Sequence, residues 1–124
     1  MAGNSGDLHE SADKLKPGTI DRHRAVVSIM EELEAVDWYD QRVDATSDPE
    51  LAKILAHNRD EEKEHAMMTL EWLRRHDPKL DEHMRTYLFT TTSVLDVEHA
   101  AENASKGGDG SADDGSLGIG SLRG

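Results

Sequence analysis

Three prolines divide this chain of 124 residues, and long stretches without proline or glycine lie between them. They stand at positions 17, 49 and 78. From Ile20 to about Asp44 the apolar residues recur at steps of three and four, as on one face of an α-helix. The same spacing returns after Pro49. The chain is therefore expected to be all-α, with two helices of about 25–28 residues each.

Local signals predict where these helices begin and end. Thr19 is expected to cap the first helix, which runs to about Asp44. The second helix has two candidate caps, Ser47 with capping-box spacing and Asp48, and runs to about His76. Because the turn between the helices is short, we expect an antiparallel hairpin.

The chain changes character after the second helix. A third helix is predicted from Pro78 to about Phe89, and a short last helix from Ser93 to Ala104. Seven of the ten glycines lie at or after Gly107, which is typical of a flexible linker. We therefore expect a flexible N-terminal segment, a helical part, a linker and a terminal peptide, bounded as 1–18, 19–104, 105–116 and 117–124.

The terminal peptide, Leu117 to Gly124, returns to aliphatic side chains spaced by small ones. It is either a docking segment that binds in extended form or an unstructured end.

Composition limits the core and the partners. Only 35% of the residues are hydrophobic and 4% aromatic, so the chain either stays partly disordered or completes its core with another chain. The formal charge of −12 disfavours nucleic acid and anionic membranes. The absence of cysteine excludes disulfides and thiolate metal sites. No apolar run could span a membrane and no secretion signal begins the chain, so a cytoplasmic protein is expected.

Each long helix carries a carboxylate in the middle of its apolar stripe. The first stripe comprises Ala25, Ile29, Glu32, Val36, Tyr39 and Val43, and the second Leu51, Leu55, Asn58, Glu62, His65, Thr69 and Trp72. Neither stripe contains Arg or Lys, and an uncompensated buried carboxylate is costly. A metal ion could supply the missing positive charge.

Glu62 and His65 form a Glu-x-x-His pair, whose side chains leave one side of a helix. Di-iron carboxylate bundles use two such pairs and one Glu from each of two further helices. This chain supplies one pair and Glu32, so two copies would be needed to complete the site and a four-helix bundle. The alternative is a solvated acidic face over residues 60–64. No His-Glu-x-x-His zinc motif is present, and the stripes hold too few histidines for a haemerythrin-like carrier.

Other residues near these stripes have open interpretations. Tyr39 could hydrogen-bond a metal ligand or simply pack in the core. A neighbouring line of side chains, Glu31, Glu34 and Trp38, could attract cations or could simply be a solvent-exposed face of the helix. His57 is expected at the surface.

Three stretches carry a family resemblance. The residues are RHRAV at 22–26, MEELEAVDWYDQRVD at 30–44 and NRDEEKEH at 58–65. They resemble the encapsulated ferritins, which are cargo proteins of bacterial encapsulin nanocompartments. Residues 117–124, LGIGSLRG, are similar to the peptide by which encapsulin shells capture cargo.

The resemblance implies a ferroxidase that oxidises Fe(II) to Fe(III) with dioxygen at a di-iron centre. It implies that Glu32, Glu62 and His65 are the iron ligands, shared between two subunits, with Tyr39 close by. Glu31 and Glu34, beside Trp38, match a second metal site on the uptake side, which would take calcium or another divalent ion.

The resemblance also implies an assembly and a location. The expected assembly is a homodimer within a ring-shaped homodecamer, held by residues 117–124 to an encapsulin shell in the bacterial cytoplasm. Two other functions stay open on the residues alone: a non-enzymatic helical adaptor, and a protein that sequesters zinc or manganese without turnover.

Overall fold

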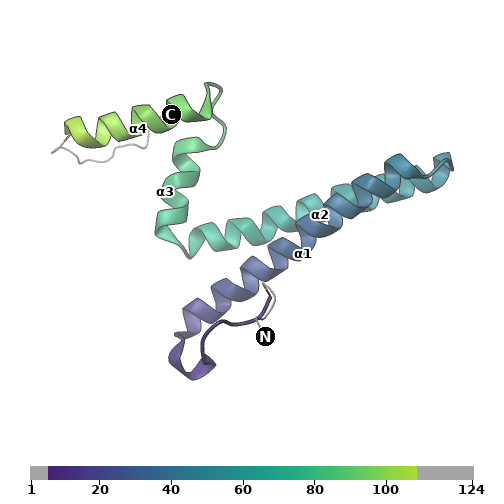
Figure 1. The fold of residues 1–124 in the computed structure, drawn as a ribbon, viewed down its shortest axis with the longest axis horizontal. Helices are drawn as coiled ribbons and strands as arrows, with labels where there is room; N and C mark the ends of the chain where they lie inside the picture. The colour runs from purple at the N-terminus through teal and green to yellow at the C-terminus, as the bar shows by residue number, and fades with distance from the viewer. Residues whose placement is uncertain (1–5, 109–124) are drawn as a thin grey trace. The chain divides into compact units, whose positions relative to one another are not determined.

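The computed structural model describes residues 6–108, and every regular element in that range is helical. The described chain forms two compact units, one up to His76 and one from Asp77 onward. The elements are a 3-10 turn, η1 (Ala12–Lys14), and four α-helices, α1 (Pro17–Ala45), α2 (Pro49–Arg75), α3 (Pro78–Tyr87) and α4 (Val94–Gly108) (Figure 1). The predicted all-α fold is confirmed. None of the described helices is both long and apolar enough to cross a membrane.

Helices α1 and α2 lie side by side as an antiparallel hairpin (Figure 1). Asp48 caps α2, since its Oδ1 accepts hydrogen bonds from the backbone N–H groups of Glu50 (2.9 Å) and Leu51 (3.2 Å). Pro49 fills the first helical turn, where a missing N–H has no cost. Of the two predicted caps, Asp48 is therefore the one that acts.

The start of α1 differs from the sequence prediction. The helix begins at Pro17, so Thr19 lies inside its first turn instead of capping it. Proline fixes the φ angle that a first helical turn needs, and this outweighs the cap preference of threonine. The segment before α1 folds back along it, and His23 Nε2 donates a hydrogen bond to the carbonyl of Gly6 at 3.0 Å.

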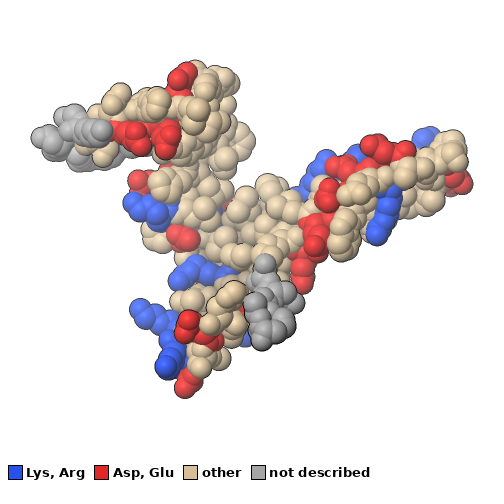
Figure 2. Space-filling view, viewed as in Figure 1, with Lys and Arg blue, Asp and Glu red and all other residues tan. Residues whose placement is uncertain are grey.

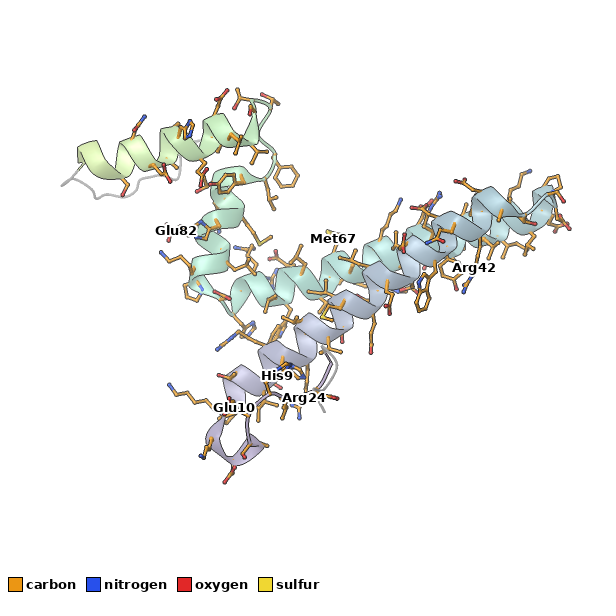
Figure 3. The ribbon with its side chains drawn as sticks, viewed as in Figure 1. His9, Glu10, Arg24, Arg42, Met67 and Glu82 are labelled. Atoms are coloured by element: carbon orange, nitrogen blue, oxygen red, sulfur yellow. The ribbon has the colours of Figure 1, made fainter. Side chains whose placement is uncertain are left out.

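The hairpin buries very little. Among the described residues only Ala25, Ala66 and Leu73 are buried. Apolar side chains are exposed along both helices instead, and Met67 stands on the outside of α2 (Figure 3). The larger ones are Val26, Met30, Leu33, Trp38, Leu51, Ile54, Met67 and Met68. A single chain thus leaves apolar faces uncovered, as an isolated protomer of an oligomer does.

The second unit consists of α3 and α4, which pack against each other. Asp77 caps α3 by accepting from the Leu80 N–H at 3.0 Å. The helix ends at Tyr87, slightly earlier than predicted, and Phe89 adopts a left-handed φ of 65°. Helix α4 continues to Gly108, beyond the predicted end at Ala104 and into the expected linker. The remainder of that linker and the terminal peptide 117–124 lie outside the described residues.

Candidate metal centre

Three potential metal ligands converge near the middle of the hairpin. Glu62 and His65 come from successive turns of α2, and Glu32 faces them from α1. One ligand atom of each lies within 4.8 Å of the others. Two ligands that sit about 2.1 Å from a shared ion are at most about 4.2 Å apart, so small side-chain rotations bring all three onto one cation. In the described part of the chain this is the one cluster of three or more such side chains.

The burial of Glu32 points to a cation. Its Oε1 atom is buried and has no hydrogen-bond partner. A buried carboxylate oxygen without a donor loses its hydration and gains nothing in return. Two carboxylates and one imidazole form a nitrogen and oxygen donor set that suits iron, zinc or manganese. The residues present therefore fit a divalent metal.

The cluster holds half of the ligand set that a di-metal carboxylate centre uses. It supplies three side-chain ligands, two of them negative, for one divalent ion. Di-metal centres hold their ions about 3.5–4 Å apart and need about twice as many ligands. All three side chains are half-buried, so each remains partly accessible from outside the single chain.

Glu61 lies next to the cluster and was not predicted from the sequence as a site residue. Its Oε1 lies 3.9 Å from His65 Nε2, and its Oε2 lies 3.7 Å from His57 Nε2. His57, Glu61 and His65 follow one another at intervals of four on α2, and this spacing was the sequence signal that could have predicted their contact. His57 is exposed, as predicted. Glu61 therefore connects the surface to the His65 side of the cluster.

The structure leaves the other predicted site residues outside the cluster. Glu31, Glu34 and Trp38 are exposed on α1, where they form the predicted line. Tyr39 is half-buried, and the guanidinium of Arg42 lies 5.5 Å from the centre of its ring. That distance is within the range of a cation–π interaction.

Lys or Arg and Asp or Glu side chains both occur along the hairpin, among uncharged residues, on the face drawn in Figure 2. At the end of α2, Glu71 receives hydrogen bonds from Arg74 (2.7 Å) and Arg75 (2.7 Å), and these arginines lower the pKa of Glu71 to about 2. The pair of arginines also meets the negative end of the helix dipole.

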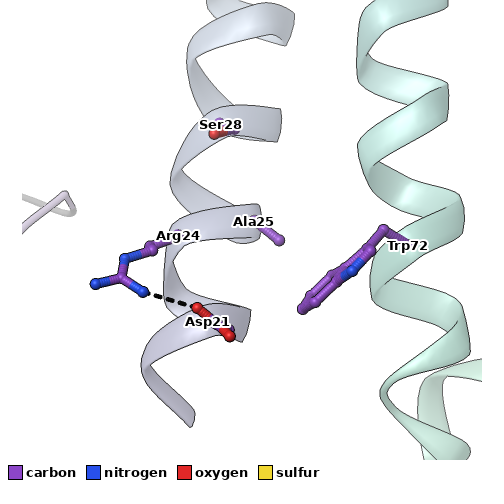
Figure 4. A pocket seen from close by; sticks show the side chains of 5 residues that line it. All are labelled: Asp21, Arg24, Ala25, Ser28 and Trp72. Carbon is purple, nitrogen blue, oxygen red and sulfur yellow. Dashed lines mark hydrogen bonds and ion pairs between the residues drawn. The ribbon is translucent and has the colours of Figure 1, made fainter. Parts of the chain in front are cut away.

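An open pocket of about 310 Å³ lies between the start of α1 and the end of α2, away from the metal cluster. Trp72 reaches from α2 toward Ala25 of α1, and Asp21 pairs with Arg24 at 2.7 Å on the rim (Figure 4). The indole of Trp72 stacks on His76, with 3.9 Å between ring centres. Ser28 completes the lining.

Comparison with known proteins gives consistent matches. The family described as EncFtn-like matches residues 7–91. The "Encapsulated ferritin-like protein" of Rhodospirillum rubrum is 63% identical over 131 positions, which cover 100% of this chain and 93% of that protein. The "Encapsulin nanocompartment cargo protein EncC" of Myxococcus xanthus is 37% identical over 59 positions, which cover 48% of this chain and 45% of that protein. A crystal structure of protein ne0167 from Nitrosomonas europaea has a TM-score of 0.67 and 57% identity, covering 69% of this chain and 94% of that one.

Proposed function

This chain belongs to the encapsulated ferritin-like family, and from that premise we propose that it is a ferroxidase that oxidises Fe(II) to Fe(III) with dioxygen. The observation that carries the proposal is the cluster of Glu32, Glu62 and His65, with its buried and unpartnered carboxylate oxygen. In this reaction iron is the substrate, and each Fe(II) gives up one electron.

Two copies of the chain would bind two Fe(II) ions between them. Each copy contributes two carboxylates and one neutral imidazole, so the negative charge of the paired site balances two divalent ions. Carboxylates are hard ligands that suit iron in both oxidation states.

The exposed apolar faces of the hairpin support pairing of chains. Two hairpins that share the metal centre would form a four-helix bundle, which supplies the core that one chain lacks. We further propose a ring-shaped homodecamer of such dimers, on the strength of the family resemblance.

Fe(II) would reach the centre past Glu31 and Glu34, beside Trp38. These acids are exposed and can attract calcium or other divalent ions from solvent. Tyr39 would donate a hydrogen bond from its hydroxyl near the centre, with its ring held by Arg42.

The names of the relatives, encapsulated ferritin-like and encapsulin cargo, support a place inside an encapsulin nanocompartment of the bacterial cytoplasm. Residues 117–124 would bind the inner face of the shell. Because a hairpin dimer encloses no storage cavity of its own, Fe(III) would mineralise within the shell.

A single experiment separates this function from its alternatives. Fe(II) is added to the protein without oxygen, air is then admitted, and ferric absorbance and oxygen uptake are followed. A ferroxidase binds Fe(II) stoichiometrically and oxidises it faster than buffer does. A metal-sequestering protein binds without faster oxidation, and a helical adaptor does neither.

A further inference from the structure

An ion pair joins α1 to α2 between the metal cluster and the hairpin turn. Arg59 Nη1 of α2 donates to Asp40 Oδ1 of α1 at 2.9 Å, and Arg59 Nε donates to Asp60 Oδ1 at 3.1 Å. The Arg59 side chain is only 23% exposed. Asp40 and Asp60 raise the pKa of Arg59, so this guanidinium stays charged. We name this three-residue contact the Arg59 clasp.

Apolar packing is weak in the same part of the hairpin. All described residues from 33 to 61 are exposed or half-buried, and the buried Ala25 and Leu73 lie on the other side of the cluster. Within residues 33–61, the Arg59–Asp40 contact is the one ion pair or side-chain hydrogen bond that crosses between the helices. In a well-packed core, interlocking side chains fix how two helices are placed against each other. In this segment of the single chain, the directional Arg59–Asp40 contact can fix that placement.

The clasp is placed to orient the metal ligands. Arg59 lies one turn before Glu62 on α2, and Asp40 lies about two turns after Glu32 on α1. A rotation of α2 by one residue turns its side chains by about 100°, which would point Glu62 away from Glu32. Fixing Arg59 on Asp40 therefore fixes the direction in which Glu62 leaves the helix.

We propose that Arg59 and Asp40 are positioning residues for the metal centre, which set the rotation and register of α2 against α1. The proposal rests on the proposed function, since it takes Glu32, Glu62 and His65 as the ligands. Arginine suits this task because its planar group donates to Asp40 and Asp60 at the same time.

The test uses Co(II), whose visible absorption reports coordination geometry, added to the full-length chain without iron. Arg59→Gln and Asp40→Asn should each weaken Co(II) binding about 10–100-fold, which is the range for groups that support metal ligands. Each should also change the absorption spectrum of bound Co(II). The double reversal Asp40→Arg with Arg59→Asp should recover most of the loss. Lys79→Gln, which breaks the exposed Lys79–Glu82 pair (3.0 Å) of α3, is the matched control and should bind like the parent.

Circular dichroism and thermal unfolding of each variant separate positioning from folding. Variants with parent-like helicity and weaker Co(II) binding support the proposal, and so does recovery in the double reversal. Parent-like affinity and spectrum in both Arg59→Gln and Asp40→Asn overturn it while leaving the ferroxidase proposal intact. If Arg59→Gln does not fold, Asp40→Asn and the reversal decide. A parent protein that binds no Co(II) overturns both proposals.

Discussion

The Nδ1 atom of His65 lies 3.7 Å from Oε1 of Glu62, one turn earlier on α2. This separation is too long for a hydrogen bond and is short enough for both atoms to bind one ion. Glu32 closes the group from α1, so both helices of the hairpin contribute to it.

Removing any one ligand should stop oxidation without unfolding the chain. We expect Glu32→Gln, Glu62→Gln and His65→Asn each to lower kcat/KM for Fe(II) oxidation at least about 100-fold, because loss of a ligand exceeds loss of a supporting group. Stopped-flow ferric absorbance measures the rates. Glu82→Gln, an exposed acid of α3, is the control (Figure 3). Parent-like rates in all three variants would refute the assignment.

In the absence of metal, Glu32 should lower the free energy of unfolding. Glu32→Leu removes the buried carboxylate oxygen that lacks a partner, and we expect it to raise the free energy of unfolding in chelator by about 1–3 kcal/mol. Added metal should then stabilise the parent and not the variant. Denaturant unfolding with and without metal measures both effects. Glu64→Leu, at an exposed site of α2, should change stability by less than about 0.5 kcal/mol.

Association should depend on the exposed apolar face of α1. Leu33 is 49% exposed in the single chain, and Leu33→Glu would place a charge within any apolar contact it makes. Sedimentation velocity should show smaller species for this variant than for the parent, and Gln41→Glu should sediment like the parent. Anaerobic Fe(II) should favour assembly of the parent and chelator should oppose it, because empty carboxylates repel one another. Equal sedimentation of Leu33→Glu and parent would exclude this face as an interface.

Acid should weaken the end of α2 through Glu71. The pKa of this carboxyl falls from an ordinary 4.5 to about 2, first through its hydrogen bond from Arg74 and then through that from Arg75. A lowered folded-state pKa gives stability that is present above about pH 4.5 and is lost as the pH falls toward about 2. The carboxylate is 41% exposed, so the effect should be small and should shrink in high salt. Urea midpoints from pH 2 to 6 should vary less in Glu71→Gln than in the parent, and an identical pH profile would contradict this.

Deleting residues 117–124 should abolish loading into a co-expressed encapsulin shell and leave Fe(II) oxidation in solution unchanged. A chain with the same eight residues in shuffled order controls for composition. Co-purification of the truncated chain with shells, at the parent's ratio, would show that another part of the protein binds the shell.

Most of the hairpin and the ligand group could be predicted from the sequence. Steps of three and four placed Glu32, Glu62 and His65 on facing stripes, because a regular helix converts spacing into direction. The predicted start of α1 was wrong because the cap preference of Thr19 was given more weight than the fixed φ angle of Pro17, at which the helix begins. Helix α4 passes its predicted end and includes Gly107 and Gly108 despite the low helix propensity of glycine, so propensity alone did not locate its end. The Arg59 clasp could not be predicted, since Arg59 and Asp40 are separated by 19 positions and are brought together by the geometry of the turn.

Three buried residues are too few to stabilise a hairpin of this length, so we expect the folded state to depend on the concentration of the chain. Where stability comes from contacts between copies, dilution removes it and a higher concentration of the chain restores it by mass action. We expect dilute chains to be neither well folded nor able to hold two iron ions. A compartment that concentrates many copies would then favour the folded and assembled form, which oxidises iron. Dilute chains elsewhere in the cell would oxidise little.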